Sequence, residues 1–434
     1  MPKTMPLLGL VLWLLTGVAL AGEVHNNLDL ADGTEMSVVR YLAEGGDRET
    51  GKGGDEGNAA VLWLPSEHGL TPGLDRVATA LSRQGVDVWV ADPYTTWFLP
   101  VAKSSLAEFR REPLAELVDR LHADTGKRVV VVSNDRASRV ALEVARKAQQ
   151  AHSASLVGVV LISPNLYRQT PQPGEPAQFE PIAAATNLPV FLMVADNSTL
   201  KLRLAAIASE FGKGGGRAYV QVLPDVRDRF FFRPDALSNE VATADRLPGL
   251  LRQAMGMLAH ETVPERVAEL QEPGEALAES RTQTLAPYAG SLIPPAFSRV
   301  DLDGQRHRLD DYRGQVVLLN FWASWCPPCI HEMPSMARLQ RQFADRPFHI
   351  LAVNLGQSRA EVEQFLETTP VNFPVFLDEA KVEPTRWQVF AFPTSYLIDA
   401  EGRIRYGVAG GLEWDSEAVV EAVSGLLDEA GAGR

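Results

Sequence analysis

Short apolar runs alternate with amphipathic stretches between residues 60 and 223. The runs have strand length and no regular polar alternation, which is typical of strands that are buried on both faces of a sheet. They lie at residues 60–64, 86–90, 128–132, 157–162, 189–194 and 218–223, with helix-period stretches at 74–81, 114–121, 136–148 and 202–211 between them. This alternation predicts an α/β domain with a mostly parallel sheet, right-handed crossovers and helices on both faces.

The pattern changes after residue 262. Residues 263–287 are rich in Pro, Gly and Glu and hold no sustained apolar stripe, which indicates a linker. A second domain is predicted at 288–432, where hairpin patterns, a buried strand at 316–322 and a final helix at 416–427 follow one another. A chain of 434 residues is long enough for two domains, here 24–262 and 288–432.

The first 21 residues have the pattern of a secretory signal peptide. Lys3 precedes an apolar run at 6–20, and Ala19-Leu20-Ala21 supplies the small residues that signal peptidase reads. The run is shorter than the roughly 20 residues of a membrane-spanning helix, so cleavage of 1–21 is predicted, with a retained membrane anchor as the alternative. Export would place the protein in an oxidising compartment such as a bacterial periplasm.

Composition and charge narrow the class of protein. The chain is 45% hydrophobic and 22% charged, which fits a globular protein, and its formal net charge is −14. That charge argues against nucleic-acid binding, which requires a basic surface. The chain has two cysteines, and both stand in Trp325-Cys326-Pro327-Pro328-Cys329, shortly after the apolar strand at 316–322.

The position of this cysteine pair predicts a redox-active dithiol. A strand that leads into a helix places Cys326 at the helix N-terminus, where amide groups and the helix dipole stabilise its thiolate. Cys329, one turn further, can then attack the mixed disulfide and release the reduced client. Pro327 and Pro328 fit the first helical turn and remove two amide donors, so the thiolate is less stabilised and the pair is expected to act as a reductant.

Two other uses of the cysteines fit the sequence less well. A structural zinc site needs about four ligands, and His331 is the one further donor nearby. A purely structural disulfide that spans two residues would restrict the unfolded chain very little. We therefore expect neither a metal nor a cofactor.

The C-terminal region resembles the TlpA and ResA type of exported thiol-disulfide oxidoreductases, a group within the thioredoxin superfamily that includes the cytochrome c maturation thioredoxins. The shared motifs are Phe-Trp-Ala-Ser-Trp-Cys-Pro-Pro-Cys at 321–329, Glu-Met-Pro at 332–334 and Phe-Pro-Thr at 392–394, and residues 357–390 match the family's extra strand and helix. The resemblance implies a thioredoxin-like fold and protein-disulfide reductase activity. It also implies two partners, a disulfide-bearing client protein and a membrane-embedded thiol reductase that donates electrons.

The same resemblance implies a client-binding edge beside the dithiol. Pro393 is expected to follow a cis peptide bond, which would bring the backbone of Phe392 next to Cys326 as an edge for a client strand. The other client contacts are expected at Trp325, Pro327, Pro328 and Thr394.

A proton-managing group is implied at Glu332. Thioredoxin carries a buried acid on its central strand, whereas this chain has Asn320 there. The resemblance implies that Glu332, which lies on the same helix as Cys329, takes over that catalytic role. An exposed helix carboxylate is the alternative.

The N-terminal region resembles the α/β-hydrolase fold through weaker motifs. His68-Gly69 lies where hydrolases often carry an oxyanion-loop His-Gly, and Ser-Asn-Asp-Arg-Ala at 133–137 occupies the place of the Gly-x-Ser-x-Gly elbow. Asp135 then holds the nucleophile position and Asp196 that of the triad acid. After the last strand the next histidine is His260, so a general base is missing, and we expect a non-catalytic scaffold or binding module.

The sequence thus predicts an exported thiol-disulfide oxidoreductase that reduces protein disulfides through Cys326 and Cys329, with the N-terminal domain recruiting a partner or client. Two alternatives stay open. One is an accessory factor of metallochaperone type for copper-site or cytochrome c maturation, and the other is a bifunctional protein with residual hydrolase activity. The sequence makes no prediction of oligomeric state.

Overall fold

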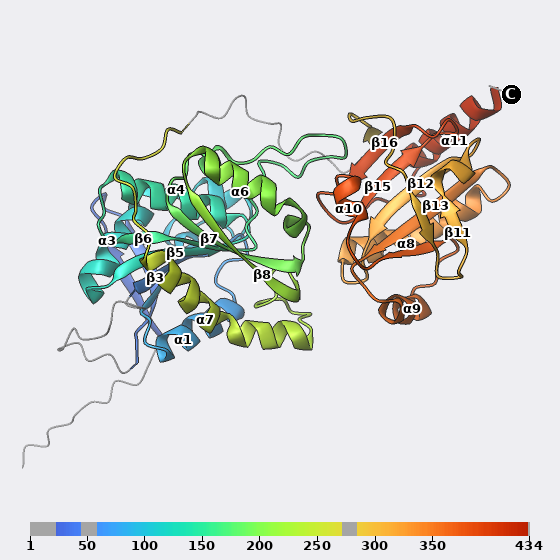
Figure 1. The fold of residues 1–434 in the computed structure, drawn as a ribbon. Helices are drawn as coiled ribbons and strands as arrows, with labels where there is room; N and C mark the ends of the chain where they lie inside the picture. The colour runs from blue at the N-terminus through green and yellow to red at the C-terminus, as the bar shows by residue number, and fades with distance from the viewer. Residues whose placement is uncertain (1–22, 45–58, 271–283, 433–434) are drawn as a thin grey trace, which may run out of the picture.

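The chain folds into two α/β domains, seen side by side in Figure 1. The computed structural model describes residues 23–44, 59–270 and 284–432. The predicted signal peptide at 1–21 lies outside these residues. Within them, no helix combines the length and the apolar character that crossing a membrane requires.

The N-terminal domain is built on an eight-stranded sheet with the order β1-β2-β4-β3-β5-β6-β7-β8. The strands from β3 onward pair in parallel, whereas β1 and β2 form an antiparallel hairpin and β2 runs antiparallel to β4. The strands are β1 (Glu23–Asp29), β2 (Glu35–Tyr41), β3 (Ala59–Leu64), β4 (Val88–Ala91), β5 (Arg128–Asn134), β6 (Leu156–Ile162), β7 (Pro189–Asn197) and β8 (Arg217–Arg227). The six apolar runs of the sequence are β3 to β8, so the predicted parallel sheet is confirmed.

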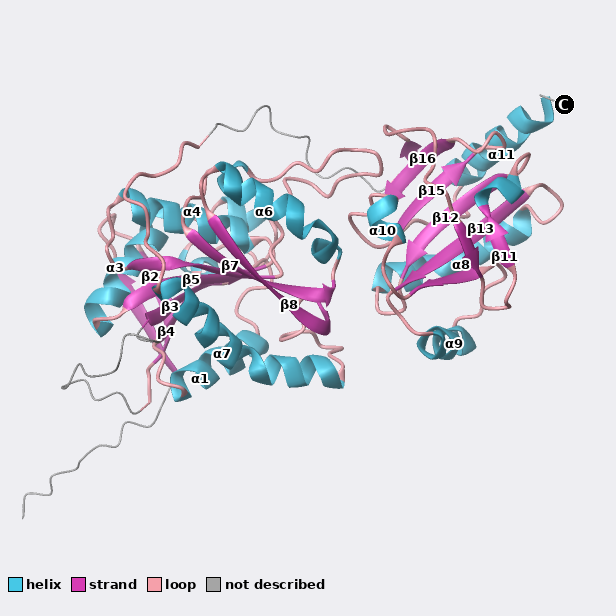
Figure 2. Cartoon of the chain, in the orientation of Figure 1, coloured by secondary structure: helices cyan, strands magenta, loops and turns pink. Residues whose placement is uncertain are grey.

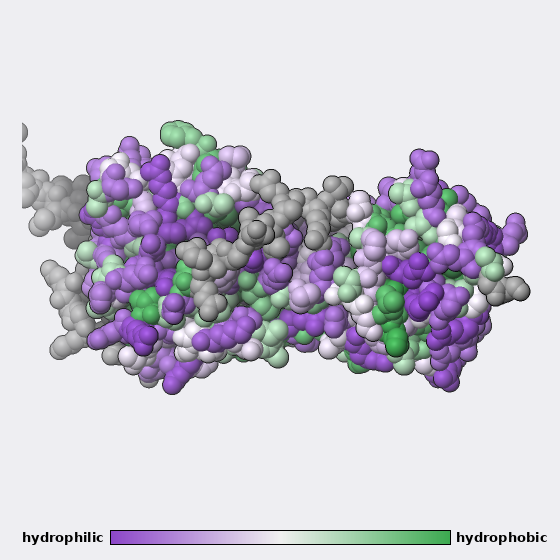
Figure 3. All heavy atoms as spheres, turned by 90° about the horizontal axis from the view of Figure 1, so that it is seen from above, coloured by the Kyte–Doolittle hydropathy of each residue, from purple (hydrophilic) through white to green (hydrophobic). Residues whose placement is uncertain are grey.

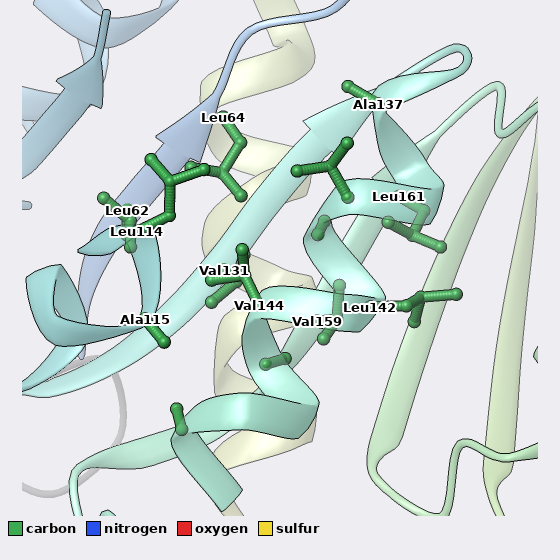
Figure 4. Packing of buried hydrophobic residues seen from close by; sticks show 14 of the residues in the cluster. Leu62, Leu64, Leu114, Ala115, Val131, Ala137, Leu142, Val144, Val159 and Leu161 are labelled. Atoms are coloured by element: carbon green, nitrogen blue, oxygen red, sulfur yellow. The ribbon is translucent and has the colours of Figure 1, made fainter. Parts of the chain in front are cut away.

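Helices cover both faces of this sheet (Figure 2). They are α1 (Pro72–Arg83), α2 (Pro93–Thr96), η1 (Ser104–Ala107), α3 (Arg111–Thr125), α4 (Ala137–Gln150), α5 (Pro181–Ala184), η2 (Thr199–Arg203), α6 (Leu204–Lys213) and α7 (Ser238–Ala259). Side chains of α1 and α7 share one buried cluster with alternate strand residues, and those of α3, α4 and α6 share the other. Figure 4 shows part of the second cluster, where Leu114 of α3 and Val144 of α4 pack near Val131 of β5.

The C-terminal domain has a six-stranded sheet with the order β14-β13-β12-β15-β16-β9. Its strands are β9 (Ala286–Pro287), β12 (Val316–Trp322), β13 (Phe348–Leu355), β14 (Val375–Asp378), β15 (Thr394–Ile398) and β16 (Ile404–Ala409), and a separate hairpin is formed by β10 (Ser298–Val300) and β11 (Arg306–Arg308). The helical elements are η3 (Leu309–Tyr312), α8 (Pro327–Gln342), α9 (Arg359–Thr368), α10 (Glu383–Arg386) and α11 (Glu417–Ala432). Strand β12 is buried along its whole length and ends four residues before the cysteine pair.

Both edges of the C-terminal sheet are covered by the chain itself. On one edge, β9 pairs with Tyr406 and Gly407 of β16. On the other edge, the loop after β10 follows β14, where Leu302 N–H donates to the carbonyl of Val375 at 3.0 Å. The β9 pairing places the last two residues of the predicted linker in this sheet.

The first part of the predicted linker lies against the N-terminal domain. Its carbonyl groups accept hydrogen bonds from side chains of α4 and of the segment before β7. The bonds run from Gln149 Nε2 to Pro264 O, from Arg146 Nη1 to Ala268 O and from Asn187 Nδ2 to Arg266 O. The described parts of the linker are therefore attached to one domain or the other.

Seen from above, the surfaces of both domains are mainly hydrophilic, with small scattered apolar areas (Figure 3). The carboxyl ends of β7 and β8 point toward the C-terminal domain (Figure 1). The loops that follow these two strands therefore lie on the side of the N-terminal domain that faces the C-terminal domain.

Candidate functional site

The cysteine pair lies at the start of α8, as the sequence predicts. Cys326 is the residue that caps the helix, and Pro327 and Pro328 are its first two helical residues. Proline suits these positions because their amide groups have no partner within a helix. Cys326 and Cys329 form a disulfide with 5.3 Å between their Cα atoms, and the amide of Cys329 donates to Sγ of Cys326 at 3.3 Å.

The two sulfurs differ in exposure in the expected order. Cys326 is 5% exposed, whereas Cys329 is fully buried. The outer cysteine is thus less exposed than we expect of a surface thiolate. Around it, Pro327 and Pro328 are exposed and Trp325 is half-buried, so a client reaches Cys326 across the two prolines.

The segment 392–394 lies beside the dithiol at the end of β12. The bond between Phe392 and Pro393 is cis, as expected, and the ring of Phe392 packs edge-on against Trp325 with 5.6 Å between centroids. Strand β15 pairs with β12, which places Thr394 opposite Phe321. In the described part of the chain, the backbone N–H and C=O of Phe392 take part in no hydrogen bond.

Thr394 is placed differently from the client contact that the resemblance implies. Its side chain is buried and its Oγ1 donates to the carbonyl of Ala391 at 2.7 Å. The hydroxyl therefore stabilises the turn from inside. Among residues 392–394, Phe392 is partly exposed, whereas Pro393 and Thr394 are buried.

Glu332 is buried, which excludes the solvated helix carboxylate that was the alternative. Its side chain accepts three hydrogen bonds: Oε1 from Asn320 Nδ2 at 2.8 Å, and Oε2 from Trp414 Nε1 at 3.0 Å and from the Leu412 amide at 3.2 Å. Asn320 Nδ2 also lies 2.9 Å from Ser395 Oγ, so the network joins α8 to β12 and β15. Burial raises the pKa of Glu332 to about 7, and the three hydrogen bonds oppose that rise.

Sequence reasoning missed Trp414, Leu412 and Ser395 in this network. Trp414 lies 82 residues after Glu332, so no local spacing links them. The one signal in the sequence is that Trp414 ends a Gly-Gly-Leu-Glu-Trp segment between the last strand and the last helix. A buried indole N–H usually finds an acceptor, and for Trp414 the acceptor is the carboxylate of Glu332.

The loop before Trp325 is held by Gln357. Its Oε1 accepts from the Ser324 amide at 2.8 Å and from Asn354 Nδ2 at 3.0 Å, and its Nε2 donates to Ser324 Oγ at 2.7 Å. These bonds fix the chain between β12 and Cys326. Gln357 begins the segment that resembles the family's insertion, so the insertion supports the dithiol loop directly.

No group of three or more His, Cys, Asp or Glu side chains arranged to hold a metal ion occurs within residues 23–44, 59–270 and 284–432. The two sulfurs and the buried carboxyl of Glu332 are thus the reactive groups that the site itself supplies.

The N-terminal domain retains the backbone of a nucleophile elbow at Asp135. This residue follows β5, precedes α4 and has a φ of +50°, a sharp strand-to-helix turn of the kind that presents a nucleophile in α/β-hydrolases. Its carboxylate accepts from Asn134 Nδ2 at 2.9 Å and from Arg229 Nε at 3.3 Å. Burial raises its pKa, and Arg229 opposes the rise.

The groups around Asp135 do not form a catalytic triad. The amide of Arg136, which would stabilise an oxyanion, donates instead to Glu67 Oε2 at 3.2 Å. Asp228 lies after β8 where a base would stand, and burial raises its pKa to about 6. Nε2 of His68 is buried and has no hydrogen-bond partner among the described residues, and its ring packs on Phe232.

Asp196 is not the triad acid that its position in the sequence suggested. Its carboxylate binds Lys201, and its Oδ2 lies 2.8 Å from Nζ of Lys381 in the C-terminal domain. These two lysines oppose the effect of burial and hold the pKa of Asp196 below its ordinary value. The side chain therefore serves an interdomain contact.

Known proteins resemble the C-terminal domain. The profile of the AhpC/TSA family matches residues 292–407. The thiol-disulfide oxidoreductase ResA of Geobacillus thermodenitrificans is 40% identical over 129 residues, which are 30% of this chain and 74% of that protein. ResA of Bacillus subtilis is 40% identical over 116 residues, 27% of this chain and 65% of that protein. Among solved structures, a putative thiol:disulfide interchange protein DsbE from Chlorobium tepidum is 31% identical, with 34% of this chain and 99% of that chain covered and a TM-score of 0.29.

Proposed function

Through its C-terminal domain the chain belongs to the ResA family of thiol-disulfide oxidoreductases, and we propose that it reduces disulfides of exported client proteins by dithiol exchange at Cys326 and Cys329. The observation that carries this proposal is the pair itself: one cysteine caps α8, and the other is buried one turn further along the helix.

The exchange proceeds in two displacements. In the reduced protein, the thiolate of Cys326 attacks one sulfur of the client disulfide, forms a mixed disulfide and releases the other client sulfur as a thiolate. The thiolate of Cys329 then attacks Sγ of Cys326, which expels the second client thiolate and leaves the Cys326–Cys329 disulfide. Two electrons have moved to the client, and a membrane-embedded thiol reductase is proposed to return two electrons to the protein.

Glu332 is proposed to take the proton of Cys329 before the second displacement. A pKa of about 7 leaves the carboxyl partly ionised near neutral pH, where a general base is most effective. The position three residues after Cys329 puts the two side chains on one face of α8. The hydrogen bonds from Asn320 and Trp414 hold the carboxyl in place.

The N-terminal domain is proposed to be a non-catalytic, hydrolase-like module that positions clients. The elbow backbone at Asp135 supports the hydrolase-like fold. Among the described residues, His68 is the one histidine near Asp135, and its Nε2 has no hydrogen-bond partner there. This arrangement supports the loss of catalysis. Export is supported by Lys3 and the apolar run at 6–20.

Trapping of mixed disulfides tests the proposed reaction. A Cys329→Ala variant, expressed with its first 21 residues in a Gram-negative host, should accumulate covalent adducts through Cys326 that are cleaved by dithiothreitol. A Cys326→Ala variant is the matched control and should form none. The trapped clients would be identified. Adducts through the haem-attachment cysteines of an apocytochrome would assign the protein to cytochrome c maturation, and adducts through the cysteines of a copper site would assign it to copper-site maturation. Equal adduct levels in the two variants would contradict the assigned order of attack.

A further inference from the structure

The N-terminal domain covers one side of the redox site. The segment after β7 forms an ion-pair contact with the loop before α10, where Nζ of Lys381 lies 2.8 Å from Asp196 Oδ2 and 2.8 Å from Asn197 Oδ1. Both charged side chains are mostly buried, with 18% of each exposed. We call this interface the seam. It is formed by residues 196–203 of the N-terminal domain and, in the C-terminal domain, by Lys381 and residues 390–392.

The seam is tight next to the proposed client edge. Asn197, Ser198 and Leu202 face Trp325 and Phe392 across a cavity of about 10 Å³. That volume is at most the space of one water molecule, so a polypeptide strand cannot enter there. The side of the dithiol formed by Trp325 and Phe392 is therefore closed by the second domain.

Further contacts extend the seam along the cis-proline segment. The guanidinium carbon of Arg203 lies 4.2 Å from the ring centroid of Phe390, and Tyr167 packs edge-on against the same ring. Gln172 Oε1 accepts from the Ala409 amide at 3.0 Å. These contacts come from two separate segments of the N-terminal domain, so the domain is held against the redox site at more than one point.

The seam also contains unpaired polar groups. Nε and Nη2 of Arg203 are buried and have no hydrogen-bond partner in the described part of the chain. Burying such groups without partners costs free energy, which offsets part of the gain from the Lys381 contact. Removal of one favourable contact should therefore loosen the seam locally, beside Trp325 and Phe392.

We propose that the N-terminal domain is a steric specificity element of the proposed reductase. It leaves the exposed Pro327–Pro328 side as the approach to Cys326, so the preferred client is a disulfide carried on an extended, flexible segment. A disulfide on the surface of a folded protein would bring its own bulk against residues 196–203. This inference rests on the proposed function and specifies the class of client.

Weakening the seam tests the proposal in the full-length chain. The rates of reduction of insulin, a folded protein disulfide, and of two short linear peptides joined by a disulfide are compared for the wild type, Lys381→Ala and Arg203→Ala. Lys213→Ala is the matched control, because Lys213 pairs with Glu210 on the exposed surface of α6. Both seam variants should reduce insulin up to about fivefold faster, the scale expected from loss of one partly exposed ion pair in Lys381→Ala and of one cation–π contact in Arg203→Ala, and should leave the peptide rate unchanged.

Hydrogen exchange supplies a second readout. The amides of residues 390–392 should exchange faster in Lys381→Ala than in the wild type, with no change in Lys213→Ala. An insulin rate that stays equal or falls in both seam variants, while the peptide rate is kept, would overturn the steric role. Failure of the wild type to reduce even the linked peptides would contradict the proposed reductase activity instead, so the two failures are distinguishable.

Discussion

Glu332 illustrates how one side chain acquires its chemistry from its surroundings. The sequence places it on the helix that carries Cys329, but its pKa depends on partners that lie far along the chain, on β12 and beyond β16. Burial raises the pKa by more than the three donors lower it. The carboxyl therefore titrates near neutral pH, where thiol exchange takes place.

The raised pKa of Glu332 predicts a pH dependence of stability. Between pH 4.5 and 7 the unfolded chain ionises this group while the folded protein keeps its proton, so stability falls as pH rises through this window and levels off above it. The loss amounts to about 3 kcal/mol for this group. Urea unfolding of the disulfide form should show it in the wild type and not in Glu332→Gln. Parallel curves for the two proteins would contradict a raised pKa.

Trp414→Phe should raise the pKa of Glu332 further. The indole N–H is the strongest of the three donors to the carboxylate, and a hydrogen bond to a charged group stabilises the folded protein by about 1.5–3 kcal/mol. We expect the pH profile of peptide-disulfide reduction to shift to higher pH, with a larger loss of stability above pH 7 than below it. Trp387→Phe is a control, since Trp387 Nε1 is buried without a hydrogen-bond partner among the described residues.

At the scale of elements, the start of α8 is expected to favour the reducing direction of dithiol exchange. Pro327 and Pro328 remove two amide donors from the helix end that stabilises the Cys326 thiolate. A less stabilised thiolate makes the disulfide form relatively more stable and the dithiol a better reductant. We therefore expect a reduction potential nearer to about −270 mV than to about −120 mV.

Pro328→His should make the protein more oxidising. A protonated imidazole beside Cys326 stabilises its thiolate and hence the reduced form. A gain of about 1.4 kcal/mol corresponds to a shift of about 30 mV toward positive potential, measured by equilibration with glutathione. Pro328→Ala is the control for loss of the ring, and a shift of equal size in both variants would show that charge is not the cause.

Local sequence patterns predicted the strands well where the side chains of a strand are buried. The apolar runs of β3 to β7 and β12 are continuous because both faces of those strands are covered, whereas β8 at the sheet edge is partly exposed. The hairpin of β1 and β2 was missed, because its alternating polar residues near the N-terminus give no such run. Trp414 and Ser395 were missed for another reason: their role comes from contacts across the fold, which no spacing in the sequence reveals.

At the scale of the whole molecule, the N-terminal domain combines an elbow-like turn at Asp135 with neighbouring groups that form no catalytic triad. Glu67 occupies the amide of Arg136, and Arg229 pairs with Asp135. The sequence motifs pointed to Asp135, and the structure places this residue at a strand-to-helix turn. They misplaced Asp196, because its partner Lys381 belongs to the other domain, 185 residues away.

The full-length protein should hydrolyse no ester. Glu67→Ala frees the Arg136 amide, yet in the described part of the chain no histidine is hydrogen-bonded to Asp135, so this variant should be equally inactive toward a panel of p-nitrophenyl esters. Both proteins should retain the peptide-disulfide reduction of the wild type. Ester turnover that disappears in Asp135→Asn would instead establish a second activity in the N-terminal domain.

The covered edges of the redox sheet have a consequence for the protein in concentrated solution. Outer strands normally offer their unpaired amides and carbonyls to a neighbouring molecule, and this is a common start of fibrous aggregation. Here β9 pairs with β16 at one edge, and the loop after β10 bonds to β14 at the other edge. Part of the outer edge of β14 and of β16 is thus already occupied, which leaves less of this sheet for a second copy of the protein to extend.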